Sequence, residues 1–212
     1  MAKKQEKASL NKPQGGRPSA AESALISDRI LEAAWAIVLE EGPDALTFDK
    51  LATKASAGKA TIYARFTDKI GLARAMLERR IALVEEEFDA DLPEAASLGA
   101  ELALLADRIA SMMADSEGRA LERMVDWMDI ADAQAGLQTR AWLYGRSAGM
   151  IAHHLANIAA RWGSRLVEPT FVARFWLESV FGHARMSTSI DTTPDWSRRH
   201  AKIFESLFER VD

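Results

Sequence analysis

The stretch from Leu46 to Lys69 constrains the fold most strongly, because it contains two short apolar segments joined by a tight connection. Apolar residues in the first segment recur at the spacing i, i+3, i+4 and i+7, which places them on one face of a short helix. They are Phe48, Leu51, Ala52 and Ala55. Thr47 lies where the N-cap is expected, since a hydroxyl there can accept a backbone hydrogen bond. We therefore predict a short helix that begins after Thr47.

The second segment, residues 58–66, is predicted to be another short helix with a polar outer face. Ile62 and Phe66 share its apolar side. The polar side chains of this segment point largely away from that apolar side. They are the cations Lys59 and Arg65, the hydroxyl of Thr61 and the phenol of Tyr63. Such groups can contact phosphates and base edges in a DNA groove. The pair of segments indicates a helix-turn-helix, although Tyr63 could instead be a core aromatic and the cations could be ordinary surface charges.

The remaining chain is predicted to be helical, so the fold class is all-α. Helical periodicity is found in residues 23–41, from 68 to before Pro93, in 98–112, 121–128, 133–162 and 169–186, and from Pro194 to Phe208. Gly42 and Pro43 end the first of these helices. No segment alternates as a strand would, and no sequence repeat is present. Residues 21–67 are expected to form a helix-turn-helix domain, and residues 68–212 a larger helical domain.

Composition excludes several classes of protein. Apolar residues make up 48% of the 212 residues, which is enough for a packed core. The sequence has no cysteine, so disulfides, thiolate metal sites and cysteine nucleophiles are excluded. No apolar run approaches the length of about 18 residues that a membrane span needs. The N-terminus lacks the apolar region of a secretory signal, so a cytoplasmic location without membrane contact is expected.

Charge is distributed unevenly along the chain. Residues 1–80 carry a net charge of +4 within a protein whose formal net charge is −4. Residues 1–20 contain five Lys and Arg with almost nothing apolar, so a flexible basic arm is expected. The arm could reach DNA, or it could be only a solubilising tail. A basic end on an acidic body is typical of a protein that contacts DNA with one end.

An enzyme is not expected. His153 and His154 are adjacent, but neighbours on a helix point about 100° apart and are poorly placed to chelate one ion. Gly149, Met150, Asn157 and Ile158 occupy the positions one turn away, so no His or carboxylate completes a metal site and a surface or pocket-edge role is favoured. Motifs of serine hydrolases, P-loops and dinucleotide-binding folds are absent from the sequence. No catalytic residue, metal site or cofactor is therefore predicted.

The helix after Pro169 is apolar on more than one face, which predicts either deep burial or an interface. Together with the last helix it could form a four-helix bundle with the same helices of a second copy. The residues predicted for this dimer interface are Phe175, Val180, Phe181, Phe204 and Phe208.

Methionine and tryptophan gather in the middle helices. They could simply fill the core, but as a group they also suit the lining of a site for a small apolar or aromatic ligand. The residues predicted to line such a site are Met112, Met124, Trp127, Met128, Trp142 and Met150.

The segment LTFDKLATKASAGKATIYARFTDK resembles the DNA-binding signature of the tetracycline-repressor (TetR/AcrR-type) transcriptional regulators. ILEAAWAIVLEEGPDA before it and LARAML after it resemble the flanking helices of that family, and together the resemblance covers about 60 residues. It implies a homodimer that inserts one recognition helix per copy into successive major grooves of an operator. The residues it implies at the DNA are Thr47, Lys59, Ala60, Thr61, Tyr63, Arg65 and Lys69.

Three positions depart from the family pattern. Ser56 stands where the turn usually has Gly, and Ala57 stands where Val is usual. Gly58 replaces the usual Ser or Thr cap, so it offers no hydroxyl to a phosphate. These departures bear on the geometry of the turn.

We expect a homodimeric repressor that a small apolar or aromatic ligand releases from a pseudo-palindromic operator. A DNA-binding architectural or division-coupled protein without a ligand is the alternative, and a filled core between the middle helices would favour it. A helical enzyme or a pure protein-interaction module is a third hypothesis, which specific DNA binding would remove.

Overall fold

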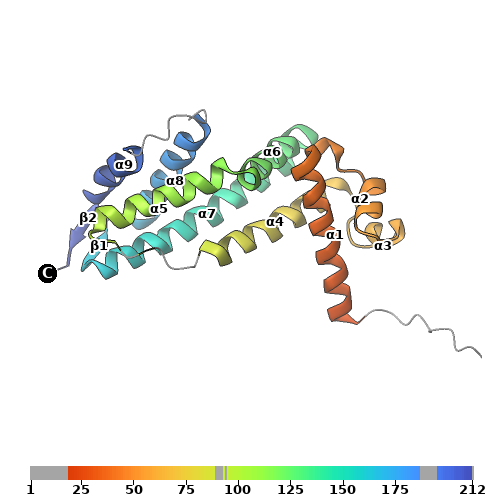
Figure 1. Cartoon of the computed structure of the whole chain (residues 1–212), viewed down its shortest axis with the longest axis horizontal. Coiled ribbons are helices and arrows are strands. Elements are labelled where there is room, and N and C mark those ends of the chain that lie inside the picture. Colours follow the sequence, from red (N-terminus) through yellow and green to blue (C-terminus); the bar gives the residue numbers. More distant parts are fainter. Residues whose placement is uncertain (1–18, 89–92, 94, 187–194, 212) are drawn as a thin grey trace, which may run out of the picture.

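Helices make up nearly all of the regular structure in the computed structural model of this chain (Figure 1). The structure describes residues 19–88, 93, 95–186 and 195–211. Most of the predicted basic arm and the predicted start of the last helix at Pro194 lie outside these residues. The all-α prediction is confirmed, with an N-terminal helix-turn-helix followed by a helical domain.

The N-terminal helices are α1 (Ala20–Glu41), α2 (Phe48–Lys54) and α3 (Lys59–Tyr63), with a 3-10 turn at Pro43–Ala45 between the first two. Ser19 begins α1 with a capping box, since its hydroxyl accepts from the Glu22 amide and the Glu22 carboxylate accepts from the Ser19 amide. Gly42 ends α1 with a φ of 87°, a left-handed conformation that suits glycine.

Within the described residues, six further helices follow. They are α4 (Lys69–Phe88), α5 (Leu98–Ala114), α6 (Ser116–Ala131), α7 (Ala133–Arg161), α8 (Pro169–Met186) and α9 (Trp196–Glu205). Most begin with a side-chain cap, as Ser97 does for α5, Asp115 for α6 and Asp132 for α7. Asp68 accepts from the Gly71 amide at 2.7 Å, as predicted for the start of α4.

Two short strands correct the prediction that no strand is present. β1 (Ser164–Leu166) pairs antiparallel with β2 (Phe208–Arg210), and Leu166 lies opposite Phe208. Phe208 was expected on the last helix, but α9 ends at Glu205. Three residues are too few to show an alternating pattern, so the sequence gives no strand signal here.

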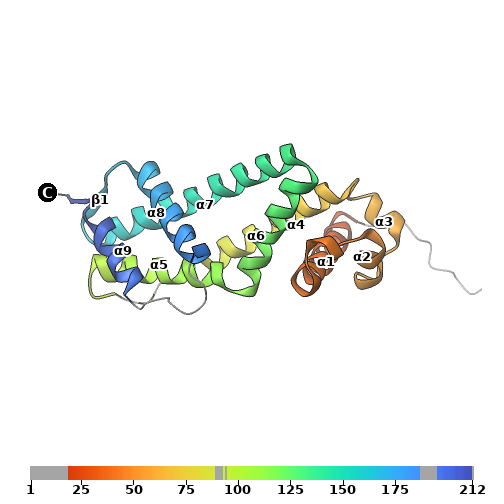
Figure 2. The same ribbon diagram turned by 90° about the horizontal axis from the view of Figure 1, so that it is seen from above.

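The buried side chains form two clusters. One joins α1, α2 and α3 with the first half of α4 and the inner face of α6, and the other joins α5, α7, α8 and α9. Figure 2 shows α1, α2 and α3 at one end of an elongated molecule, with α4 and α6 between them and the remaining helices. Packing therefore continues across residue 67, where we expected the domain boundary.

Candidate DNA interface and ligand cavity

The turn between α2 and α3 has the backbone geometry of a helix C-terminus that ends in a Schellman motif. The Ala57 amide donates to the Ala52 carbonyl at 3.0 Å and the Ser56 amide to the Thr53 carbonyl at 3.2 Å. Ser56 has a φ of 48°, so a serine adopts the left-handed conformation at the position where the family usually has Gly. The atypical residues thus keep a regular turn.

Helix α3 is anchored on its inner side and exposed on its outer side. Ile62 is completely buried, and Phe66 beyond the helix is 9% exposed. Lys59 and Ala60 are exposed, as is Tyr63 at 54%. Its ring packs edge-on against Phe48 with centroids 4.7 Å apart, so α2 fixes the direction in which the phenol points. Thr61, also predicted at the DNA, is partly exposed.

Thr47 and Arg65 are engaged in holding the domain together. The Thr47 hydroxyl accepts from the Lys50 amide at 3.2 Å and thereby caps α2. Arg65 donates to the Ser27 hydroxyl at 3.1 Å and the Ser23 hydroxyl at 3.3 Å, both on α1. It also donates to the Thr61 carbonyl at 3.1 Å. Both residues have structural roles, and their contact with phosphates stays a prediction.

Lys69, at the first position of α4, is directed at α6. Its ammonium lies 4.5 Å from the centroid of the Trp127 ring, which is a cation–π contact. Burial lowers the pKa of Lys69, and the charge of Asp44 opposes this shift. A phosphate contact at Lys69 would therefore also affect Trp127 on α6.

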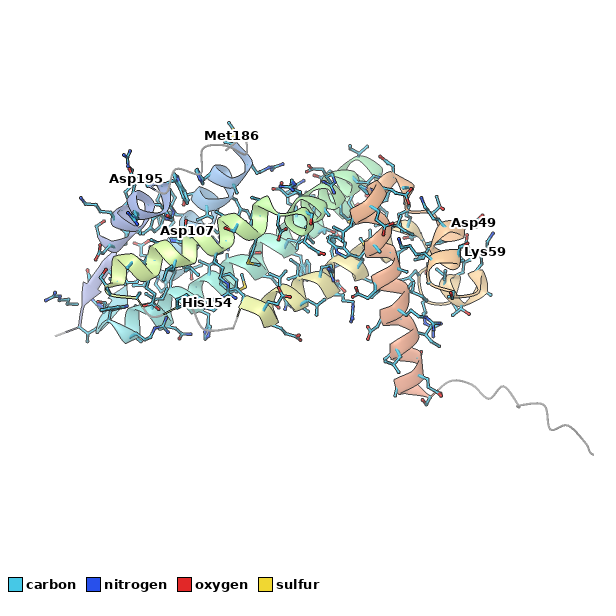
Figure 3. The ribbon with its side chains drawn as sticks, in the orientation of Figure 1. Asp49, Lys59, Asp107, His154, Met186 and Asp195 are labelled. Atoms are coloured by element: carbon cyan, nitrogen blue, oxygen red, sulfur yellow. The ribbon has the colours of Figure 1, made fainter. Side chains whose placement is uncertain are left out.

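Carboxylates pair with the lysines of the helix-turn-helix. Lys59 lies 2.7 Å from Asp49, Lys54 lies 2.6 Å from Glu40, and Lys50 pairs with Glu41. Figure 3 shows Asp49 and Lys59 together at the outer end of the molecule, away from the larger helical domain.

Two adjoining cavities lie between the helices of the larger domain. One has a volume of about 460 Å³ and the other about 320 Å³. Residues from α4 to α8 line both of them, namely Ile81, Met113, Gly118, Leu121, Ser147 and Phe181. The lining is mainly apolar, which suits a small ligand with an apolar body.

The predicted ligand-binding residues are only partly brought together. Met112 and Met150 line the smaller cavity. Met124 and Met128 are completely buried in the N-terminal cluster instead, because that face of α6 packs against α1. Trp127 lies under Lys69, and Trp142 lies under Arg146 with the guanidinium 5.8 Å from its ring centroid. These four residues are not in the lining of either cavity.

A polar cluster joins the wall of the smaller cavity to α1. The Trp35 indole donates to Glu117 at 2.6 Å, and Arg80 donates to the same carboxylate oxygen at 2.5 Å. Arg80 also lies over the Trp35 ring at 4.9 Å. Since Arg80 and Glu117 line the cavity, its wall is bonded directly to a helix of the N-terminal unit.

The outer face of α8 and α9 exposes aromatic and aliphatic side chains. Phe171 is 63% exposed and stacks on Phe175, which is 47% exposed, and Ile203 is 63% exposed. Val180 and Phe204 are 0% and 2% exposed within the chain itself, which corrects their prediction as interface residues, because they have no surface left to bury. Of the other predicted interface residues, Phe181 lines the cavities and Phe208 is on β2.

The histidines do not form a catalytic or metal-binding arrangement. Nε2 of His200 lies 2.6 Å from the Ser179 hydroxyl, but the buried Nδ1 has no hydrogen-bond partner, so an orienting acid is missing. Burial, aided by the nearby His183, lowers the pKa of His200 to about 4. His153 contacts Asn157 at 3.0 Å. Among the described residues, no group of three or more His, Asp or Glu side chains could hold a metal ion, and no helix could cross a membrane.

An N-terminal helix-turn-helix with an exposed second helix, followed by a larger helical domain, is the arrangement of many helix-turn-helix transcriptional regulators. The sequence profile of "Bacterial regulatory proteins, tetR family" matches residues 30–76. A Mycobacterium bovis protein described as an uncharacterized HTH-type transcriptional regulator is 32% identical over 81 residues, which cover 38% of this chain and 43% of that protein. The chain thus spans less than half of this curated relative. Residues 30–76 of this chain are thus similar to the DNA-binding region of the TetR-family transcriptional regulators.

Solved structures share the fold. A crystal structure assigned to a TetR-family transcriptional regulator of Mesorhizobium loti has a TM-score of 0.70 and 24% identity, covering 88% of this chain and 98% of that one. FadR of Bacillus subtilis, solved with stearoyl-CoA, has a TM-score of 0.55 and 16% identity, covering 87% of this chain and 99% of that one. TetR-family regulators are DNA-binding repressors and are often dimeric and ligand-responsive.

Proposed function

We propose that this protein is a homodimeric repressor that binds a pseudo-palindromic operator through α3 and leaves it when a small apolar or aromatic ligand fills the cavities. The observation that carries the proposal is the exposed face of α3, with Lys59, Ala60 and Tyr63 at one end of the molecule, inside the segment that matches the family. Each copy would place this face in one of two successive major grooves, about 34–36 Å apart.

Each side chain on this face has a distinct chemical capacity. Lys59 can donate to phosphates or to guanine acceptors, and the exposed methyl of Ala60 can meet a thymine methyl. The phenol of Tyr63 can donate to a phosphate from the direction that Phe48 fixes. Affinity would come mainly from the cations, and sequence preference from the first turn of α3.

The two cavities support a ligand as the signal. Their combined space suits an apolar molecule, and FadR of Bacillus subtilis shows that a protein of this fold can hold stearoyl-CoA. A ligand would act by binding more tightly to a form whose recognition helices have a different separation. A ligand that moves Glu117 in the cavity wall would also affect α1, because Glu117 accepts a hydrogen bond from Trp35 of that helix.

The exposed face of α8 and α9 supports the homodimer. Phe171 and Phe175 stack on α8 and are exposed, and Ile203 is an exposed apolar side chain of α9. Two copies packed through this surface would place four helices in one bundle.

Selection of duplexes from a random library, followed by band-shift titration, tests the proposal. We expect the parent to bind a selected pseudo-palindromic duplex as a dimer, and Tyr63→Ala to bind it more weakly, because each copy loses a phosphate contact. Lys202→Ala, an exposed cation on α9, is the matched control and should bind as the parent does. Equal binding by Tyr63→Ala would show that the DNA face is assigned wrongly.

A further inference from the structure

Carboxylates outnumber cations around the two cavities of the larger domain. Of the residues that line either cavity, six are carboxylates and three are arginines, so the lining carries a formal charge of −3. The carboxylates are Glu87, Asp115, Glu117, Glu122, Asp126 and Glu178. The rest of the lining is mainly apolar, so an excess of negative charge surrounds a space that suits an apolar body.

The arginines of the larger cavity already have carboxylate partners. Arg185 lies 3.3 Å from Glu122 and 3.8 Å from Asp126. Arg140 lies 3.2 Å from Asp126 and also pairs with Asp129, which is not in the lining. An anionic ligand would have to displace these carboxylates and would then lie close to them, where like charges repel.

The smaller cavity shows the same pattern. Arg80, the one arginine among its described lining residues, donates to Glu117. Asp115 accepts from the Gly118 amide at 2.7 Å as the cap of α6. The Glu87 side chain is exposed, and its carboxylate makes no ion pair with any described residue. Here too the negative charge exceeds the positive charge.

Glu178 is the carboxylate of the larger cavity that lacks a cation. It accepts a hydrogen bond from the Tyr144 phenol of α7, and both residues line the cavity. This bond raises the pKa of Tyr144, so the phenol stays neutral and cannot balance the carboxylate. The Arg174 guanidinium lies 5.8 Å from the centroid of the Tyr144 ring, but Glu178 makes no ion pair in the part of the chain that the structure describes.

A cation at this wall would gain more than an anion or a neutral group. The carboxylate of Glu178 would attract it, and the Tyr144 ring beside that carboxylate can contact a cation through its face. Phe181 lines both cavities and offers an aromatic contact to the apolar body of the same ligand. The attraction is moderate, because Glu178 is exposed to solvent.

We propose that the ligand of these cavities is a lipophilic cation, which is a molecule with an apolar or aromatic body and one positive charge. The charged group lies beside Glu178 and Tyr144, and the body fills the apolar space between the helices. The inference rests on the proposed ligand response of this protein and names the chemical class of the ligand.

Tetraphenylphosphonium and tetraphenylborate test this class, because the two ions have nearly the same size and shape and opposite charges. Binding of each ion to the parent protein is measured by equilibrium dialysis at low and high salt. We expect tetraphenylphosphonium to bind about 10-fold more tightly at low salt, and the difference to shrink as salt rises. Equal binding of the two ions, tighter binding of tetraphenylborate, or no binding of either ion would overturn the proposal.

Glu178→Gln removes the unpaired charge and keeps the shape of the side chain. We expect it to weaken the binding of tetraphenylphosphonium about 2- to 5-fold and not to weaken that of tetraphenylborate. Glu168→Gln is the matched control, because it changes the net charge equally at an exposed residue just before α8 that lines neither cavity. If both substitutions weaken the binding of the cation equally, net charge alone is responsible and the proposal is overturned.

A band-shift titration separates this inference from the proposed function. Tetraphenylphosphonium should release the parent from its selected duplex at concentrations where tetraphenylborate does not, and Glu178→Gln should require more of it. A parent protein that binds no duplex but still prefers the cation in dialysis would refute the repressor function and support the ligand class. A parent protein that binds its duplex but prefers the anion would refute the ligand class alone.

Discussion

Ser56 adopts a backbone conformation that its side chain disfavours. A left-handed φ costs a residue with a Cβ about 1 kcal/mol, and glycine avoids that cost. The Ser56 side chain is exposed, and its hydroxyl makes no hydrogen bond to another residue in the described part of the chain, so little is lost when it is removed. We expect Ser56→Gly to raise the free energy of unfolding by about 0.5 to 1 kcal/mol, measured by urea denaturation. Ser56→Ala keeps the Cβ and should give no gain.

His200 makes stability depend on pH. Its pKa is about 4 in the folded protein, below the ordinary value of 6.5, because it is buried among Trp176, Trp196 and Phe204 with His183 nearby. Above pH 6.5 the residue is neutral in both states, and its contribution to stability is complete. As pH falls toward 4, only the unfolded state takes up the proton, so the free energy of unfolding decreases by about 3 kcal/mol.

Urea denaturation between pH 4 and pH 7 measures this dependence. His200→Phe should flatten the curve in that range, whereas His153→Gln, a change at an exposed histidine, should not alter its slope. A curve for His200→Phe as steep as that of the parent would contradict the burial argument.

The sequence predicts which side chains point outward better than it predicts which groups they contact. The outward position of Tyr63 follows from its offset from Ile62 and Phe66, and the structure agrees. The attachment of Arg65 to Ser23 and Ser27 could not be predicted, since it depends on where α1 crosses α3. Likewise, an apolar wheel cannot tell Val180, which is buried, from Phe175, which is exposed.

Helix α6 couples the cavity wall to α1 through Glu117. Glu117→Ala would leave the Trp35 indole without its acceptor and Arg80 without its closest carboxylate. We expect the free energy of unfolding to fall by about 1 to 3 kcal/mol, and hydrogen exchange to accelerate in α1 around Trp35.

Glu122→Ala provides the comparison, because Glu122 is on the same helix and pairs with Arg185 of α8 instead. Exchange in α1 that is unchanged in Glu117→Ala, or equally fast in Glu122→Ala, would rule out a dedicated link.

At the scale of elements, caps and periodicity predicted helix starts well. Asp68 and Pro169 mark the starts of α4 and α8 as expected. The β1–β2 pair escaped prediction, because it brings together segments about 40 residues apart in sequence through only three residue pairs.

The exposed apolar side chains of α8 and α9 predict that the protein is a dimer. Phe175→Glu combined with Ile203→Glu should convert a dimer into a monomer in analytical ultracentrifugation, because a carboxylate buried at an apolar interface is costly. Ile130→Glu is a suitable control, since Ile130 is 87% exposed on α6, away from this face. A dimer that survives the double substitution would place the interface elsewhere.

The cavities are a property of the assembled helices and could not be predicted in detail. Ser147 and Gly118 line both cavities, although neither has a large apolar side chain from which this could be predicted. Met124 and Met128 have such side chains, but they are buried in the N-terminal cluster. The sequence of α6 alone does not determine which of its faces packs against α1 and which faces α8, because this depends on the angles at which the helices cross.

Helix α6 belongs both to the core of the N-terminal unit and to the cavity wall, so the chain cannot simply be cut between the two. Ala120, Met124 and Met128 supply part of the core beneath α1, although they come more than 50 residues after the helix-turn-helix. A fragment cut after α4 would expose that core to water. A chimera that grafts this DNA-binding unit onto the body of another regulator would need the inner surface of α6 as well, so recombination should succeed only between chains that match at this joint.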